Sequence, residues 1–138
     1  LAIVAQAKLP LSDVDCVVSV PHHWWKRVIH QHNASEVLAD AVARTLRLSL
    51  SLKTLDRVRL ASKQGTLNRG QRHRNIEGAF RVHRGEKVQG KHLLIVDDIV
   101  TTGATAAAIC KPLRAAGVRQ ITFLAVARGL NLAVKKPN

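Results

Sequence analysis

The sequence predicts an α/β fold in which helices flank a central parallel sheet. Short apolar segments that are typical of buried strands alternate along the chain with segments of helical period, an order that builds parallel sheets. Only 3% of the residues are aromatic although 46% are hydrophobic, so aliphatic side chains and alanine must fill the core. A length of 138 residues suits one core, and we expect residues 1–138 to form a single domain.

The first strand is expected at Asp15–Val20, a short apolar run that Pro21 ends. A helix is expected to follow, because Asn33 can cap its first turn and Glu36 stands where a capping box needs an acid. The apolar face of this helix is expected to comprise Val37, Leu38, Ala41, Val42 and Leu46.

The middle of the chain gives weaker signals. The stretch Leu52–Leu60 is ambiguous between a strand and a loop. Residues 61–74 are rich in basic and small polar side chains, which predicts a mobile basic loop that passes into a short helix. A strand at Ala79–Val82 and a turn at Arg84–Glu86 are expected to follow.

The clearest unit begins with a buried strand at His92–Val96. Two acids and a small polar loop come next, followed by an alanine-rich helix that Gly117 is expected to end. Pro112 lies inside this helix and predicts a kink or a local break. A last apolar strand is expected at Gln120–Ala127.

The charge balance indicates the kind of partner. Lys and Arg outnumber Asp and Glu by 22 to 9, which gives a net charge of +13. This excess predicts anionic partners, such as phosphate-rich ligands, nucleic acid or an acidic membrane, and a basic but otherwise ordinary surface is the alternative.

The chain gives a prediction about its compartment as well. No apolar run approaches the roughly 18 residues that a membrane span needs, so no membrane insertion is expected. Cys16 and Cys110 stand far apart among apolar residues, and no CxxC or Cys/His spacing indicates zinc. Both are expected to be reduced core residues of a cytoplasmic protein. Because the chain begins at Leu1 and contains no methionine, we expect it to be part of a longer gene product.

The candidate site follows the strand at His92–Val96. In an open parallel sheet, ligands bind beyond the carboxyl ends of the strands, where Asp97 and Asp98 are expected to stand. Neighbouring carboxylates can accept hydrogen bonds from the two hydroxyls of a ribose and help to hold a hydrated Mg²⁺ ion, partly through water. The loop behind them opens a helix, and its backbone amides and hydroxyls can hold a phosphate; it comprises Thr101, Thr102, Gly103, Ala104 and Thr105.

This spacing, with groups that bind a diol followed by a phosphate-binding loop, fits a ribose 5-phosphate. A polar turn with an ordinary helix cap is the alternative, but it does not explain two adjacent acids followed by TTGAT. The stretch LLIVDDIVTTGAT (residues 93–105) resembles the thirteen-residue signature of the type I phosphoribosyltransferases.

Further matches narrow the resemblance to the competence protein F (ComF) family of that superfamily. They are a strand ending in Val20-Pro21, the stretch KQGTLNRGQRHRNIEGAF (residues 63–80), and a last strand closing in Ala127-Arg128. The similarity spans about residues 14 to 128. It implies a five-stranded parallel core and a ligand of the 5-phosphoribosyl-1-diphosphate type, bound with Mg²⁺.

The resemblance also implies two diphosphate-binding segments. The loop after the first strand would supply Ser19, Val20 and Pro21. A flexible loop around Ala61 to Asn75 would close over the ligand, and its basic residues Lys63, Arg69, Arg72 and Arg74 would meet the diphosphate. Asp97, Asp98 and Arg72 would then be the catalytic residues, with the acids orienting the ribose.

Three departures from the family pattern matter. Family members commonly carry an N-terminal four-cysteine zinc module, which is missing from this sequence either through truncation or through true absence. The segment after Pro21 reads HHWWKRVIHQHNA, which keeps Asn33 but loses the Gly, Phe and Gln of the usual motif. Purine-salvage relatives place an acid two residues before the loop glycine, where this chain has Thr101, so no general base is evident.

Three functions remain open at this point. The first is a transferase that displaces diphosphate from C1 of a phosphoribosyl group by a nitrogen nucleophile, in a setting of competence and DNA uptake. The second is a component of the DNA-uptake machinery that binds single-stranded DNA, beside a helicase partner, with little catalysis. The third is a regulator that senses a ribosyl phosphate. The acceptor is undetermined, as is the oligomeric state, for which a homodimer is one option.

Overall fold

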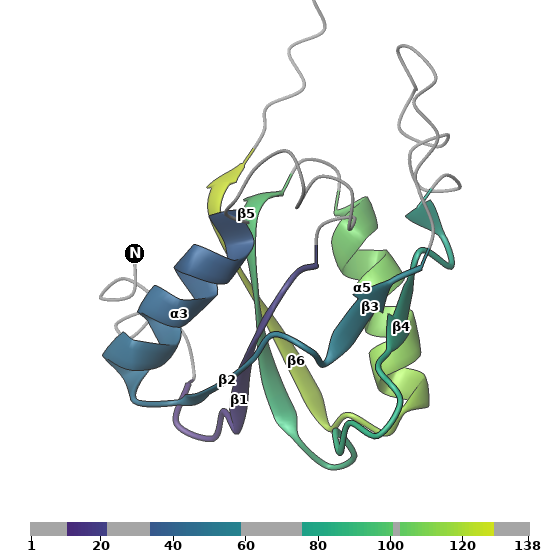
Figure 1. Cartoon of the computed structure of the whole chain (residues 1–138), viewed down its shortest axis with the longest axis horizontal. Coiled ribbons are helices and arrows are strands. Elements are labelled where there is room, and N and C mark those ends of the chain that lie inside the picture. The colour runs from purple at the N-terminus through teal and green to yellow at the C-terminus, as the bar shows by residue number, and fades with distance from the viewer. Residues whose placement is uncertain (1–10, 22–33, 59–75, 101–102, 129–138) are drawn as a thin grey trace, which may run out of the picture.

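Four parallel strands form the centre of the molecule, in the order β2-β1-β5-β6 (Figure 1). The computed structural model describes residues 11–21, 34–58, 76–100 and 103–128. A second sheet consists of the antiparallel pair β3-β4. The elements are β1 (Cys16–Ser19), α3 (Ala34–Leu46), β2 (Ser49–Ser51), β3 (Leu55–Arg57), β4 (Phe80–Val82), β5 (His92–Val100), α5 (Ala104–Ala115) and β6 (Gln120–Arg128).

The α/β fold with a parallel sheet is confirmed, and the central strands are apolar because both of their faces are covered. Every residue of β1 is buried, and Leu93 to Val96 of β5 are 0–1% exposed. Within the described residues the parallel sheet has four strands, whereas the family resemblance implied five. The segments predicted at 79–82 and within 52–60 form the separate β3-β4 ribbon instead.

The main sheet separates two layers of the core. Figure 1 shows α3 on one side of it, with α5 and the β3-β4 ribbon on the other. On the α3 side, Val17, Leu94 and Val96 pack with Val42. On the α5 side, the cluster comprises Cys16, Val18, Val20, Leu55, Ala79, Phe80, Val88, Leu93, Ile95, Ile109, Leu113 and Val118. Side chains alternate between the two faces along β1 and β5, as strand geometry requires.

Helix α3 forms as predicted, and its predicted apolar face is right for Leu38, Val42 and Leu46 but wrong for two residues. Val37 is 57% exposed, and Ala41 is exposed as well. The buried residues are Ser35, Ala39, Val42 and Ala43, and Leu38 and Leu46 pack at the edge of the same cluster. Three of the four buried side chains are small, so the face that meets the sheet carries a weak hydrophobic signal in the sequence.

Helix α5 ends at Gly117, as predicted. Gly117 has φ 80°, its N–H donates to the Arg114 carbonyl, and the N–H of Val118 donates to the Leu113 carbonyl. This is the Schellman arrangement, and Leu113 and Val118 supply its usual apolar contact. The predicted local break at Pro112 is wrong, since the helix continues through Pro112 to Ala115. Buried Ile109 and Leu113 hold the helix on the sheet on both sides of the proline.

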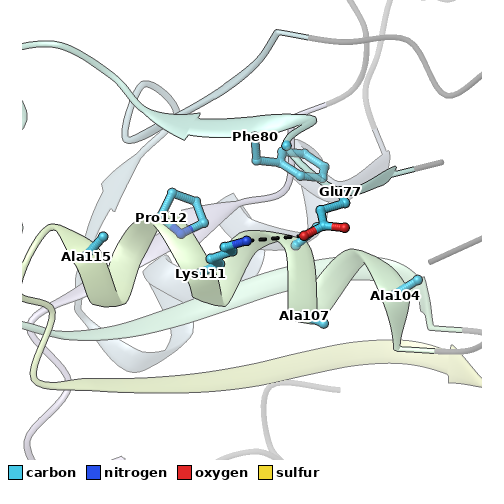
Figure 2. Close-up of a pocket in the computed structure, with 9 residues that line it drawn as sticks. Glu77, Phe80, Ala104, Ala107, Lys111, Pro112 and Ala115 are labelled. Atoms are coloured by element: carbon cyan, nitrogen blue, oxygen red, sulfur yellow. Dashed lines mark hydrogen bonds and ion pairs between the residues drawn. The ribbon is translucent and has the colours of Figure 1, made fainter. Parts of the chain in front are cut away.

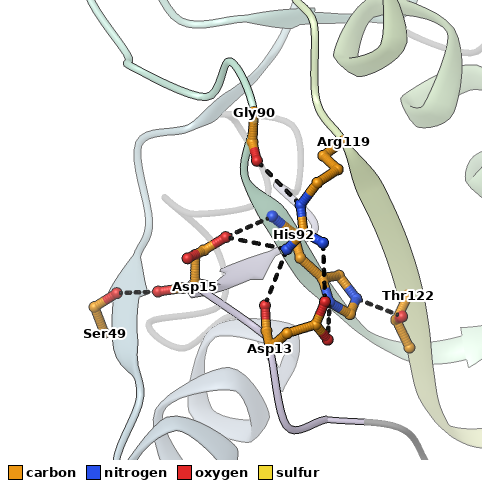
Figure 3. Close-up of polar contacts among 7 residues, drawn as sticks. All are labelled: Asp13, Asp15, Ser49, Gly90, His92, Arg119 and Thr122. Carbon is orange, nitrogen blue, oxygen red and sulfur yellow. Dashed lines mark hydrogen bonds and ion pairs between the residues drawn. The ribbon is translucent and has the colours of Figure 1, made fainter.

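A polar cluster lies at the amino ends of the parallel strands (Figure 3). His92 is fully buried; its Nδ1 lies 3.0 Å from Asp13 Oδ1, and its Nε2 lies 2.9 Å from Thr122 Oγ1. Arg119 donates to Asp13 Oδ2 at 3.0 Å, and the hydrogen bond from Arg119 is the main reason why the pKa of Asp13 is lowered. Asp15 Oδ2 accepts from the backbone N–H of His92 at 2.7 Å. Every polar atom of the buried imidazole therefore has a partner.

Cys16 and Cys110 are both free thiols. Cys16 belongs to the core, as predicted, while Cys110 is only half-buried. None of the helices that the structure describes is long and apolar enough to span a membrane.

Candidate functional site

Asp97 and Asp98 lie within β5 and not after it, which corrects the predicted strand end at Val96. β5 continues to Val100 because β6 accompanies it as far as Arg128. On its other side, β5 loses its neighbour earlier, since β1 ends at Ser19 opposite Val96. The acids thus stand just past the carboxyl end of β1, at the sheet edge where ligands of parallel α/β proteins bind.

Because β1 does not extend alongside Asp97, this side chain can contact residues from outside the sheet. Asp97 is 6% exposed, and its Oδ1 accepts from Ser35 Oγ at 3.2 Å, at the start of α3. The same oxygen accepts the backbone N–H of Asp98 at 2.9 Å, and Asp98 Oδ1 accepts the N–H of Ile99 at 2.9 Å. These bonds fix both carboxylates relative to the strand.

The pKa of Asp97 is raised to about 6, mainly by burial and then by the hydrogen-bonded carboxyl and the negative charge of Asp98, while the Asp98 N–H and Ser35 Oγ oppose the shift. The carboxyl of half-buried Asp98 is close enough to disfavour loss of the Asp97 proton. A cation or the hydroxyls of a diol placed between them would replace that proton and satisfy both. The pair is therefore suited to a hydroxylated, cation-dependent ligand.

The two carboxylates also fit Mg²⁺ as a metal. They are hard oxygen ligands, and Mg²⁺ commonly uses one or two protein carboxylates and takes its other ligands from water and substrate phosphates. Among the described residues, no group of three or more His, Cys, Asp or Glu side chains comes together to hold a metal ion alone.

Helix α5 begins directly beside this edge. Its N-cap is Gly103, at φ 75° and ψ 4°, without a side-chain cap, and no acid stands in the first turn. A residue with a side chain rarely adopts this left-handed backbone conformation, so glycine is the residue that the turn needs. Ala104 is buried and Thr105 half-buried. With no acidic side chain to complement the positive end of the helix dipole, the first turn favours an anion.

The residues predicted to bind diphosphate after β1 are largely buried. Ser19 and Val20 are each 4% exposed, and Pro21 is half-buried. The Val20 side chain belongs to the core, and its N–H donates to the Val96 carbonyl at 3.0 Å. A contribution of this segment to ligand binding must therefore come mainly from other backbone groups.

Several predicted site residues lie outside the described residues. They are Thr101 and Thr102 of the phosphate-binding loop, Lys63, Arg69, Arg72 and Arg74 of the basic segment, and the predicted helix cap Asn33.

Two residues at the site were not predicted from the sequence. Ser35 meets Asp97 across 62 positions of sequence, and a serine in the first turn of a helix is too common to indicate that contact. Arg57 of β3 lies with its guanidinium carbon 5.5 Å from the centre of the Phe80 ring. The charge of Asp97 acts on it and raises its pKa, although burial lowers that pKa more. Arg57 belongs to the stretch Leu52–Leu60, whose structure was ambiguous from the sequence, so no pattern indicated that its side chain would be half-buried.

A pocket of about 630 Å³ lies beside the site, between β4 and α5 (Figure 2). Its lining is mostly apolar, and the Lys111–Glu77 ion pair, at 3.2 Å, closes one part of it. Ala104, at the start of α5, lines the pocket, but Asp97 and Asp98 do not. The pocket therefore neighbours the candidate site without containing its carboxylates. It is lined by Glu77, Gly78, Phe80, Ala104, Ala107, Ala108, Lys111, Pro112 and Ala115.

Comparisons with known proteins show which family the chain is similar to. Residues 32–136 match the family described as "Phosphoribosyl transferase domain". The chain is 37% identical over 125 residues to "DNA utilization protein YhgH" of Salmonella typhi, covering 88% of this chain and 52% of that protein. It is 27% identical over 124 residues to "Competence protein F" of Haemophilus influenzae, covering 89% of this chain and 52% of that protein. The chain spans about half the length of these relatives.

A similar fold occurs in a solved structure. The purine phosphoribosyltransferase from Pyrococcus horikoshii aligns with a TM-score of 0.58 at 17% identity, covering 92% of this chain and 69% of that one. Such low identity supports the fold alone. Together with the sheet order and the acid pair on β5, these comparisons show that the chain belongs to the competence protein F (ComF) family, within the phosphoribosyl transferase domain superfamily.

Proposed function

We propose that this chain binds 5-phosphoribosyl-1-diphosphate together with Mg²⁺ and acts as a phosphoribosyltransferase in the handling of DNA taken up by the cell. The observation that carries the proposal is the fixed pair Asp97 and Asp98 beside the start of α5, where Gly103 is the N-cap. The names of the relatives, "DNA utilization protein" and "Competence protein", support the biological setting, which we place in the cytoplasm.

The described residues would hold the sugar in the following way. The carboxylates of Asp97 and Asp98 would accept the two ribose hydroxyls and keep C1 oriented for substitution. Gly103 and the first turn of α5 would direct backbone N–H groups at the 5-phosphate. Ser35 would keep the Asp97 carboxylate in place through its 3.2 Å hydrogen bond. Bound Mg²⁺ would supply positive charge to the leaving diphosphate.

The basic segment would complete this site. Lys63, Arg69 and Arg72 would contact the diphosphate, and Ser19 to Pro21 would approach it with backbone groups. No residue is evident as a general base, so leaving-group stabilisation and positioning would provide most of the rate. The acceptor nucleophile would bring its own basicity.

The test is calorimetric titration of 5-phosphoribosyl-1-diphosphate into the whole chain, with and without Mg²⁺. We expect Mg²⁺-dependent binding that the double variant Asp97→Ala/Asp98→Ala loses. A matched control is Asp40→Ala/Glu86→Ala, which removes two acids of the same charge, one on α3 and one in the turn after β4, that do not line the site or the pocket beside it. If the folded wild-type chain does not bind the compound, or if the site variant binds it as well as the control does, the proposal is wrong.

The charge of +13 supports one alternative, a basic component that binds single-stranded DNA with little catalysis. DNA affinity would then fall steeply with salt and would respond neither to 5-phosphoribosyl-1-diphosphate nor to the Asp97/Asp98 substitutions. Competition between the two ligands would instead place DNA at the sugar-phosphate site. Titration of an oligonucleotide at several salt concentrations distinguishes the two cases.

A further inference from the structure

Ser35 is a polar residue at a position where alanine would pack equally well. It lies in the first turn of α3 and is 0% exposed. The other buried residues of this helix are Ala39, Val42 and Ala43, which pack in the core on that side of the sheet. Alanine forms helix better than serine and buries no hydroxyl, so helix formation and packing do not account for a serine here.

The Ser35 hydroxyl connects α3 to the candidate site. Ser35 Oγ donates to Asp97 Oδ1 at 3.2 Å, and both side chains are buried. The rest of the buried face of α3 is apolar, and Val42 of this face packs with Leu94 and Val96 of β5. The hydrogen bond therefore adds a polar link between the docking of α3 on the sheet and a carboxylate of the site.

This bond also determines which oxygen of Asp97 a ligand can use. Oδ1 accepts the Ser35 hydroxyl and the backbone N–H of Asp98, at 3.2 and 2.9 Å. The two donors come from different elements, α3 and β5, and rotation of the carboxylate would break both bonds. Oδ1 is thus occupied by the protein, and Oδ2 is left to accept a hydroxyl of the ligand.

A hydroxyl on a helix often bonds only the backbone of its own helix. Thr45 of α3 does so, since its Oγ1 donates to the Ala41 carbonyl at 2.8 Å. Ser35 instead reaches a carboxylate 62 positions away in the sequence. This difference supports a role for Ser35 at the Asp97 carboxylate.

We propose that Ser35 is a positioning residue of the candidate site: it holds the Asp97 carboxylate in the orientation that a ribosyl ligand needs, and it thereby makes the docking of α3 part of ligand binding. Ser35 itself would not touch the ligand. The inference rests on the proposed function, which it deepens by giving α3 a share in binding of the ribose.

The test compares three probes, titrated calorimetrically into the whole chain with Mg²⁺ present: 5-phosphoribosyl-1-diphosphate, ribose 5-phosphate and inorganic diphosphate. We expect Ser35→Ala to weaken binding of the two ribosyl compounds by about 10-fold, the usual effect of losing a hydrogen bond to a charged group, and to leave the affinity for inorganic diphosphate unchanged. Thr45→Val is the matched control, since it removes a hydroxyl from the same helix away from the site.

A pair of variants separates the hydrogen bond from packing. Ser35→Thr and Ser35→Val add side chains of the same shape, which differ in the hydroxyl, so crowding in the core affects both alike. Ser35→Thr should bind ribose 5-phosphate about 10-fold more tightly than Ser35→Val does. Equal affinities of the two variants would overturn the inference, because packing alone would then explain the effect of Ser35→Ala.

Hydrogen exchange tests the link to α3. Saturating ribose 5-phosphate should slow exchange of the α3 backbone amides in the wild type, and it should slow them less in Ser35→Ala. Equal protection in the two proteins would contradict the link. The Tm of ligand-free Ser35→Ala should stay close to that of the wild type, and a clear fall in Tm with an equal loss of affinity for all three probes would assign Ser35 to folding.

The remaining outcomes are distinct for the two proposals. If the wild type binds both ribosyl compounds and Ser35→Ala binds them equally well, the inference fails while the proposed function stands. If the wild type binds ribose 5-phosphate with the help of Ser35 but does not bind 5-phosphoribosyl-1-diphosphate, the proposed function fails while Ser35 remains a positioning residue. If folded wild-type chain binds none of the three probes, both are wrong.

Discussion

At Asp97, ligand binding and folding make opposite demands. The carboxylate must be available to a ligand, yet burial and the charge of Asp98 disfavour its ionised form and raise its pKa to about 6. A folded-state pKa above the unfolded value of about 3.8 means that the folded chain holds this proton more tightly. The resulting stabilisation is complete below about pH 4 and is lost as the pH rises through 6.

We therefore expect Asp97→Asn to make the ligand-free chain more stable at pH 7.5 than the wild type. The gain is at most about 3 kcal/mol, since each unit of pKa shift corresponds to about 1.4 kcal/mol. The advantage should shrink as the pH falls toward 4. Urea unfolding at pH 4.5 and 7.5, in the presence of EDTA, measures both quantities, and a pH-independent difference between the two proteins would contradict the explanation.

His92 shows the contrasting case of a buried titratable side chain whose polar atoms are all satisfied. Thr122→Val removes the hydroxyl 2.9 Å from His92 Nε2 and keeps the shape of the side chain. We expect a loss of about 1–2 kcal/mol in the free energy of unfolding, because a buried nitrogen then lacks a partner. Thr45→Val is the control, since its exposed hydroxyl bonds only the Ala41 carbonyl of the same helix. Equal effects of the two substitutions in urea unfolding would refute this reasoning.

At the scale of single elements, the end of α3 is strained. Arg47 has φ 54°, the N–H of Arg47 donates to the Arg44 carbonyl, and the N–H of Leu48 donates to the Ala43 carbonyl. This is the arrangement that ends α5, but with arginine where α5 has Gly117.

Replacing Arg47 by glycine should stabilise the chain by about 0.5–1 kcal/mol. Relief of the left-handed backbone strain exceeds the extra entropy that glycine brings to the unfolded state. Thermal unfolding of Arg47→Gly against an Arg44→Gly control, which weakens the helix interior, provides the measurement. A Tm for Arg47→Gly at or below that of the wild type would show that the exposed side chain has a role beyond the cap.

Sequence patterns predicted the elements whose signals are local. The strand at β5, the helix after it and its end at Gly117 follow from an apolar run, small residues and a glycine. β2 was missed because Ser49–Ser51 is short and two of its three residues are serine, and pairing with β1 is what makes it a strand. The adjacent acids were predicted as a candidate site, whereas the contact of Ser35 with Asp97 depends on tertiary packing that no local pattern records.

At the scale of the whole molecule, polar residues gather at both edges of one sheet for different reasons. At the amino edge, His92, Asp13 and Thr122 satisfy one another. At the carboxyl edge, the buried Asp97 carboxyl lies beside that of Asp98, and Arg57 has a buried Nε that finds no acceptor among the described residues. The first edge contributes to stability, and the second keeps groups that a ligand can satisfy.

The distance between these edges has a thermodynamic consequence. His92 and Asp97 lie five residues apart on β5, about 16 Å, and the edges share no polar partner in the described residues. Their contributions should therefore be independent, so the effects of Thr122→Val and Asp97→Asn on the free energy of unfolding should add to within about 0.5 kcal/mol in the double variant. Urea unfolding of the two single variants and the double variant measures the coupling. Additivity would mean that free energy of unfolding lost by a substitution at one edge can be recovered by a substitution at the other. Residues of the site could then change during evolution without loss of the fold.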